Sequence, residues 1–259
     1  MTMVNTRELA QALREVSEPG AVEAQRRRAQ ALMARATPAE VSQAEQMLID
    51  GGMAPEELRA ACDIHLELLN RRNVPARDSL PAGHVLDTLY REHVEILGFL
   101  DKLDKLAARL GVTEAHDPAS EDHTLLRHLA EHLVGAEKHH QREEDVLFPE
   151  LEKRGVDGPP RIMRLEHGQF RPRKHRLLEL AETVTQPVNA PMAPAEFAAW
   201  RQEVADLAGY IVFHLRDHIF KEDNILYPTA LKMIEDAKVW AEMKRRCDGI
   251  GCCCFSPAA

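Results

Sequence analysis

The sequence predicts an all-α protein, with an up-down-up-down four-helix bundle preceded by a small helical domain. The 259 residues are 44% hydrophobic but only 5% aromatic, and they contain few β-branched runs, which favours helix over sheet. Apolar residues recur at helical spacing along several long stretches. Four of these stretches are joined by short connections, which is typical of antiparallel helices in a bundle.

Residues 1–72 are expected to form the small domain. Thr37 and Glu40 have the spacing of a helix capping box, in which each residue's side chain hydrogen-bonds to the other's backbone N–H. A last helix of this domain is predicted to begin at Pro55. Residues 73–83, which contain two prolines, are predicted to be a linker.

Residues 84–234 are predicted to form the bundle. The first helix has apolar residues at helical spacing from Leu86 to Leu103, and glycine or proline residues separate it and its successors. The four helices are expected over about 85–110, 121–153, 159–184 and 195–234. Residues 235–259 are predicted to add one helix, packed on the outside, and a cysteine-rich tail.

A His-x-x-x-Glu motif occurs twice, as His139 with Glu143 and as His218 with Glu222. Both copies continue with an apolar pair, an aromatic residue and proline. Residues four apart lie on one face of a helix, so each pair can bind one metal ion. A single copy is a common surface pair, but two copies in matching contexts indicate metal binding.

A Glu-His pair precedes each copy, and its histidines are His93 and His167. In the predicted topology each helix hairpin brings one of these histidines to the His and Glu of the next helix. Two hairpins then form a two-metal site, and imidazole with carboxylate suits iron, manganese or zinc. Each glutamate can bridge both ions, and an oxo or hydroxo bridge would neutralise the remaining positive charge.

These motifs resemble the hemerythrin-like (HHE cation-binding) family over about residues 83–232. The resemblance implies a four-helix bundle around a non-haem di-iron centre, with two iron ions as cofactor and a small diatomic ligand, O₂ or NO. The ligands that match the family pattern are His93, His139, Glu143, His167, His218 and Glu222. Residues 1–72 resemble a helical domain of unknown function that is often fused ahead of such bundles.

The sequence departs from the oxygen-carrying hemerythrins. Their fifth histidine lies one turn after the third-helix ligand, where this chain has Arg171. Their last carboxylate is an aspartate five residues after its histidine, whereas Glu222 follows His218 by four. The ligand set is closer to that of di-iron proteins for the repair of iron centres, which implies reaction with O₂, NO or peroxide under oxidative or nitrosative stress. Whether the protein is an enzyme stays open. The alternatives are a redox or oxygen sensor acting through a protein partner at residues 1–72, and O₂ or iron storage without turnover.

Other residues near the motifs have less specific interpretations. His214 lies one turn before His218, but the first copy has Gly135 there, which favours a role other than metal ligand. His140 is expected to face away from the ions. Phe148 and Tyr227, before the two prolines, are expected to pack the end of the bundle.

Four acids adjacent to the predicted ligands have two interpretations. They accept hydrogen bonds from ligand histidines, or they form solvated helix faces. These acids are Glu92, Glu144, Glu166 and Asp223.

The five cysteines also have two interpretations. They are incidental thiols, four of them in a frayed tail, or they form a second, thiolate-rich site for a soft metal or for redox chemistry. They are Cys62, Cys247, Cys252, Cys253 and Cys254. An odd, clustered set is a poor disulfide framework and indicates a reducing compartment.

Charge and hydropathy exclude other classes. A net charge of -9 argues against nucleic-acid binding, which requires a basic surface. The first residues lack the apolar segment of a signal peptide, and no stretch approaches the roughly 18 apolar residues of a membrane helix. A cytoplasmic protein without a membrane partner is therefore expected.

Overall fold

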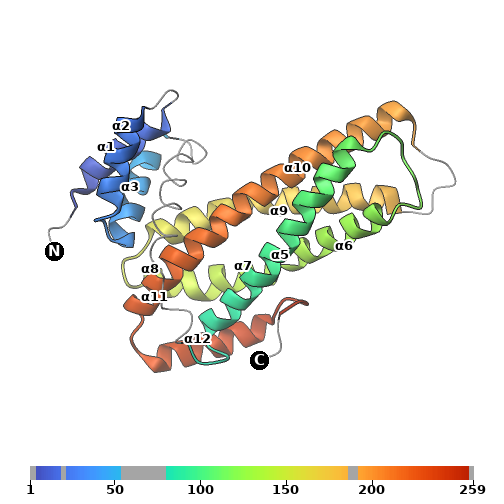
Figure 1. The fold of residues 1–259 in the computed structure, drawn as a ribbon. Helices are drawn as coiled ribbons and strands as arrows, with labels where there is room; N and C mark the ends of the chain where they lie inside the picture. The colour runs from blue at the N-terminus through green and yellow to red at the C-terminus, as the bar shows by residue number, and fades with distance from the viewer. Residues whose placement is uncertain (1–3, 19–21, 54–79, 186–191, 257–259) are drawn as a thin grey trace.

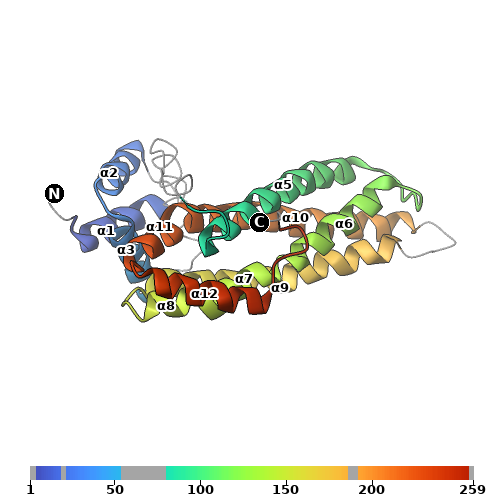
Figure 2. The same cartoon turned by 90° about the horizontal axis from the view of Figure 1, so that it is seen from below.

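The computed structural model describes residues 4–18, 22–53, 80–185 and 192–256. Within these ranges the regular structure is helical and contains no strand, so the predicted fold class is confirmed. A long bundle carries a small group of N-terminal helices at one end, near α8 and α11 (Figures 1 and 2). None of the helices in these ranges combines the length and the apolar character of a membrane span.

The N-terminal group contains three described helices. They are α1 (Thr6–Ser17), α2 (Glu23–Met33) and α3 (Pro38–Asp50). The predicted capping box is present at the start of α3: Thr37 N donates to Glu40 Oε2 at 2.7 Å, and Glu40 N donates to Thr37 Oγ1 at 3.3 Å. The helix predicted from Pro55, Cys62 and most of the linker lie outside the described residues.

The four bundle helices pack in a ring, each against two neighbours, α5 on α6, α6 on α9, α9 on α10 and α10 on α5. The first is α5 (Val85–Val112), and the third is α9 (Gly158–Thr185). The second consists of α6 (Glu121–Gly135), α7 (Glu137–Arg142), η2 (Glu143–Leu147) and α8 (Phe148–Glu152). The fourth consists of α10 (Pro194–Lys221), η3 (Glu222–Leu226) and α11 (Tyr227–Met233). The last helix, α12 (Ala237–Ile250), packs on α5, α7 and η2 from outside the ring, as expected.

A polar layer separates two apolar clusters in the bundle. Along α5, one cluster includes Tyr90 and the other begins at Ile96, with His93 between them. On the other three helices the predicted ligands likewise lie where one cluster gives way to the other, and each of the six is at most 1% exposed. Burying so many polar groups is costly unless they find partners, which marks this layer as the candidate site.

Each copy of the repeated motif contains a π-helical turn, η2 or η3, which the sequence analysis did not predict. Phe148 N donates to Glu143 O, and Tyr227 N donates to Glu222 O, five residues back in each case. In an α-helix such residues are about 140° apart around the axis, whereas the wider turn brings them closer to one face. π-turns of this kind are frequent at functional sites.

Candidate metal centre

The four predicted ligand histidines form two pairs in the polar layer. His93 Nε2 lies 3.0 Å from His139 Nε2, and His167 Nε2 lies 2.9 Å from His218 Nε2. Two nitrogens that bind one ion at about 2.1 Å and at a right angle are about 3.0 Å apart. Each pair is therefore spaced to bind one ion.

Glu222 lies between the two pairs. Its Oε2 is 3.1 Å from His93 Nε2, while its Oε1 is 2.9 Å from His218 Nε2. The two oxygens of one carboxylate thus face different histidine pairs. This is the arrangement expected of a bridging ligand.

Glu143 also spans the pairs, and Tyr227 holds it. Glu143 Oε2 is 3.7 Å from His139 Nε2 and 3.6 Å from His167 Nε2. The Tyr227 hydroxyl donates to Glu143 Oε1 at 2.6 Å and lies 3.4 Å from Nε2 of both His93 and His139. Tyr227 and Phe148 both pack in the apolar cluster at this end of the bundle, as expected. The hydroxyl of Tyr227 has an additional contact that was not expected, because it reaches Glu143 in the polar layer.

The inner carboxylates have oxygens that no donor satisfies. Among the described residues, Glu143 Oε2 and both oxygens of Glu222 are buried without a hydrogen bond. An unsatisfied buried carboxylate is costly, and a cation is the usual compensation. In the described residues, three groups have all their ligand atoms within 4.8 Å of one another: His93, His139 and Glu222; Glu143, His167, His218 and Glu222; and His140, His167 and His218. The first two contain only predicted ligands. These residues fit two ions that share Glu222.

A second ring of acids surrounds the histidines. Each histidine places Nδ1 against a carboxylate from a neighbouring helix of the ring. For the second, third and fourth helices this neighbour is the helix before it in the chain, and for the first helix it is the fourth. The pairs are His139 with Glu92 at 2.8 Å, His167 with Glu144 at 2.8 Å, His218 with Glu166 at 2.7 Å and His93 with Asp223 at 2.6 Å. A carboxylate only accepts, so Nδ1–H donates, and in the neutral imidazole Nε2 keeps its lone pair for the centre. The acids therefore orient the histidines and are not merely a solvated face.

Cations keep two of these acids ionised. Arg142 donates to Glu92, and Lys221 Nζ lies 2.8 Å from Glu166. Burial opposes ionisation of Glu92, but His139 and Arg142 bring its pKa to about 2. Burial likewise opposes ionisation of Glu166, but Lys221 and its histidine partner bring its pKa to about 2. Both acids are therefore acceptors at neutral pH.

Without a metal ion, the pKa values of the two inner acids, Glu143 and Glu222, are shifted in opposite directions. Burial and the neighbouring Glu222 raise the pKa of Glu143 well above its usual range. Burial would also raise the pKa of Glu222, but His218 and its other histidine contacts hold it well below. Two adjacent buried carboxylates cannot both ionise without compensation, and metal ions would remove this conflict.

His140 does not face away from the centre, so that expectation was wrong. It is 2% exposed, and its ring stacks on His167 with centroids 3.9 Å apart. The inward stripe of a bundle helix spans more than 100°, so two consecutive residues can both face the interior. His214, by contrast, belongs to no metal-ligand group found in the described ranges, and its ring lies 4.1 Å from that of Tyr210. Arg171 pairs with Glu137 and with Glu144.

The C-terminal tail folds back onto the ring of acids. Cys253 N donates to Glu92 Oε1 at 3.4 Å, and the Ser256 hydroxyl donates to the same oxygen. Arg142 Nη2 lies 3.9 Å from Cys253 Sγ. The tail is thereby connected to His139 through the carboxylate of Glu92.

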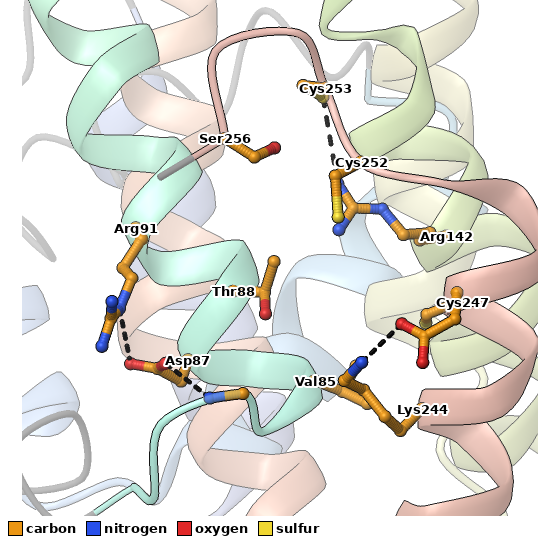
Figure 3. A pocket seen from close by; sticks show the side chains of 12 residues that line it. Val85, Asp87, Thr88, Arg91, Arg142, Lys244, Cys247, Cys252, Cys253 and Ser256 are labelled. Atoms are coloured by element: carbon orange, nitrogen blue, oxygen red, sulfur yellow. Dashed lines mark hydrogen bonds and ion pairs between the residues drawn. The ribbon is translucent and has the colours of Figure 1, made fainter. Parts of the chain in front are cut away.

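The structure brings three of the predicted site cysteines together. Cys247, Cys252 and Cys253 line a pocket of about 290 Å³, opposite Thr88 and Arg91 of α5 (Figure 3). Cys254 lies elsewhere, with Sγ 3.6 Å from His132 Nδ1, and Cys62 is outside the described ranges. The metal-ligand groups found in the described residues contain no cysteine. The thiolate-rich site therefore stays a prediction.

The fold and the polar layer define a metal-binding four-helix bundle. The family model of the hemerythrin HHE cation binding domain matches residues 84–230, more than half of the chain, and the chain belongs to this family. A family of unknown function, DUF438, matches residues 9–72.

Two curated relatives are similar to this chain. The iron-sulfur cluster repair protein YtfE of Musicola paradisiaca is 27% identical over 166 residues, which are 63% of this chain and 69% of that protein. The protein of the same name from Salmonella schwarzengrund is 30% identical over 96 residues, which are 36% of this chain and 40% of that protein.

Proposed function

We propose that this chain is a non-haem di-iron protein that reacts with O₂, NO or peroxide in the repair of iron-sulfur clusters under oxidative or nitrosative stress. One observation carries the proposal: two pairs of histidines face each other in the polar layer, and between them Glu143 Oε2 and both carboxylate oxygens of Glu222 have no hydrogen-bond donor among the described residues. The names of the two relatives support the repair role. A protein with a damaged cluster would be the partner, and residues 1–72 are the proposed surface for it.

The proposed metal ligands are His93, His139, Glu143, His167, His218 and Glu222. Two bound irons would supply one-electron redox chemistry and a position for a diatomic ligand. The outer carboxylates keep the histidines in the Nδ1–H tautomer, and burial keeps bulk water from the centre. The Tyr227 hydroxyl holds a proton beside the pair formed by His93 and His139. The other pair has no such hydroxyl from the repeated motif, because the residue of the first copy that corresponds to Tyr227 is Phe148.

Two measurements test this proposal. Metal analysis and the optical and magnetic spectra of the purified protein should give two irons per chain. A zinc-only protein, or one that retains both irons after His139→Ala combined with Glu222→Ala, would overturn the assignment.

The repair role needs its own assay. An iron-sulfur enzyme inactivated with NO should recover activity when the iron-loaded protein is added. Glu222→Ala should abolish the recovery, while Glu95→Ala, at an exposed position of α5, should retain it. Equal recovery with both variants would contradict the proposal, and one stoichiometric reaction with NO per chain would favour a sensor or a store.

A further inference from the structure

Another pair of histidines lies on the second bundle helix, outside the polar layer. His128 and His132 are four residues apart on α6, and His128 is exposed while His132 is half-buried. Their Nε2 atoms are 3.1 Å apart. This distance is close to that within the two histidine pairs of the candidate centre. It therefore also fits two nitrogens that bind one ion at about 2.1 Å.

The two rings have an orientation in which they can share an ion. Their planes are 88° apart, and their centroids are 4.3 Å apart. A metal ion lies close to the plane of each imidazole that binds it, and two perpendicular planes meet along a line that satisfies both. Residues four apart lie on one face of a helix, so the backbone already holds both side chains on the same side.

His132 is fixed by its surroundings. Its ring stacks on Phe99 of α5 with centroids 4.7 Å apart and 4° between the planes, and the ring of Phe255 lies 5.8 Å from it. Cys254 Sγ is 3.6 Å from Nδ1 of His132. Where Nδ1–H donates to this sulfur, Nε2 keeps its lone pair for an ion. His132 thus gives up less side-chain freedom on binding an ion than a free surface histidine would.

The chemistry of the pair favours a transition metal. Burial and, after it, His128 lower the pKa of His132, so protons compete little for its nitrogen at neutral pH. Among the described residues no third side chain completes a metal-ligand group with this pair, so water would fill the other positions. Imidazole nitrogens suit zinc, copper or nickel, whereas magnesium and calcium prefer oxygen ligands.

We propose that His128 and His132 bind one divalent transition-metal ion, such as zinc, through their Nε2 atoms, and that Cys254 positions His132 for it. This site goes beyond the di-iron function, because it uses none of the six predicted ligands. His132 precedes His139 by seven residues, which is about 10 Å along the helix, so the ion would be separate from the candidate centre. Since Cys254 and Phe255 belong to the C-terminal tail, metal binding and docking of the tail on α6 would stabilise each other.

Zinc is a suitable probe, and calorimetry measures its binding. The iron-loaded protein would be titrated with zinc in the wild type, in His128→Gln and in His132→Gln. Each variant should have one zinc site weakened about 100-fold, because the second bond of a chelate is intramolecular and is lost with either imidazole. Any zinc bound by the cysteines contributes equally to all three titrations.

A matched control is His175→Gln, which removes an exposed histidine of α9 and should bind zinc as the wild type does. Zinc affinity within twofold of wild type in both His128→Gln and His132→Gln would overturn the proposal. A protein that fails to bind two irons but shows the expected difference would overturn only the di-iron function.

The role of Cys254 needs a conservative variant. Cys254→Ala removes the acceptor at Nδ1 and should raise the dissociation constant for zinc about tenfold. Cys254→Ser keeps an acceptor and should restore most of the affinity. Equal losses in the two variants would overturn the positioning role, because they would mean that the thiolate itself binds the ion.

A structure of zinc-soaked crystals tests the site without any substitution. Anomalous scattering should place a zinc ion about 2.1 Å from Nε2 of both His128 and His132. Zinc found at the polar layer or at Cys247 and Cys252, with none between these two histidines, would contradict the proposal.

Discussion

The centre depends on acids that would touch no ion. Each histidine receives its orientation from a carboxylate on a neighbouring helix, and Arg142 or Lys221 keeps two of these carboxylates ionised. A metal ligand held in this way loses little orientational freedom on binding, and its basicity rises. The outer acids should therefore contribute to metal affinity.

Replacing Glu166 with glutamine tests this contribution. Glu166→Gln keeps the shape but removes the charge that orients His218, so we expect iron affinity to fall about 10- to 100-fold. Competition with a chelator measures it. Glu179→Gln, in an exposed ion pair of the same helix, is the control and should bind iron as the wild type does. Equal affinity in the two variants would show that the acid does not act on the centre.

The Tyr227 hydroxyl should stabilise the metal-free protein. Tyr227→Phe leaves Glu143 Oε1 without its donor in a buried layer, which should cost about 1–3 kcal/mol in the free energy of unfolding. Urea denaturation measures the change. Tyr210→Phe removes a hydrogen bond from the half-buried Tyr210 to Gln169 and should cost less. A loss for Tyr227→Phe no larger than that of this control would contradict the role assigned to the hydroxyl.

The metal-ligand candidates could be predicted from sequence, because the His-x-x-x-Glu spacing is local and occurs twice, and a Glu-His pair precedes each copy. The four acids beside them could be named as candidates, but the histidine that each acid meets could not be predicted, because every one of these contacts joins two helices. Glu92 holds His139 across two helices, and Asp223 holds His93 across 130 positions of the chain. The inward face of His140 depends on the width of the bundle interior, which no local pattern gives.

At the scale of elements, helices were predictable, but their internal irregularity was not. The helical spacing of the apolar residues predicts the four long helices. A π-turn adds one residue to a single turn, and this small change does not disturb the spacing enough to be seen along a helix of many turns. The two prolines that follow η2 and η3 are the one local signal, since proline removes a backbone donor. The turns matter because they bring Tyr227 into the polar layer.

The tail is the element whose packing thiol chemistry can test. Cys252 and Cys254 are exposed, whereas burial raises the pKa of Cys247 to about 11 and that of Cys253 to about 12. Because the thiolate is the nucleophile, iodoacetamide at pH 8 should label Cys252 at least about tenfold faster than Cys253. Peptide mass spectrometry locates the label, and the difference should vanish in denaturant. Equal rates in the native protein would mean that the tail does not dock on Glu92.

At the scale of the whole molecule, the described contacts between the two units are few. α3 lies against α9, and Arg161 pairs with Asp50 at 2.9 Å, with both side chains more than half exposed. An exposed pair of this kind contributes about 0–1 kcal/mol. Metal binding in the bundle should therefore leave the N-terminal unit's stability nearly unchanged.

Thermal unfolding with and without iron tests this independence. Both tryptophans of the chain, Trp200 and Trp240, lie in α10 and α12, so their fluorescence reports only the bundle and its last helix. Iron at about 1,000 times its dissociation constant adds about 4 kcal/mol of stability. For a bundle of this size that raises the midpoint by about 8–16 °C. Circular dichroism, which reports all helices, should show this shifted transition and a second one that iron does not move. If both probes instead report one transition that shifts as a whole, the units are tightly coupled, and residues 1–72 would sense the metal centre directly.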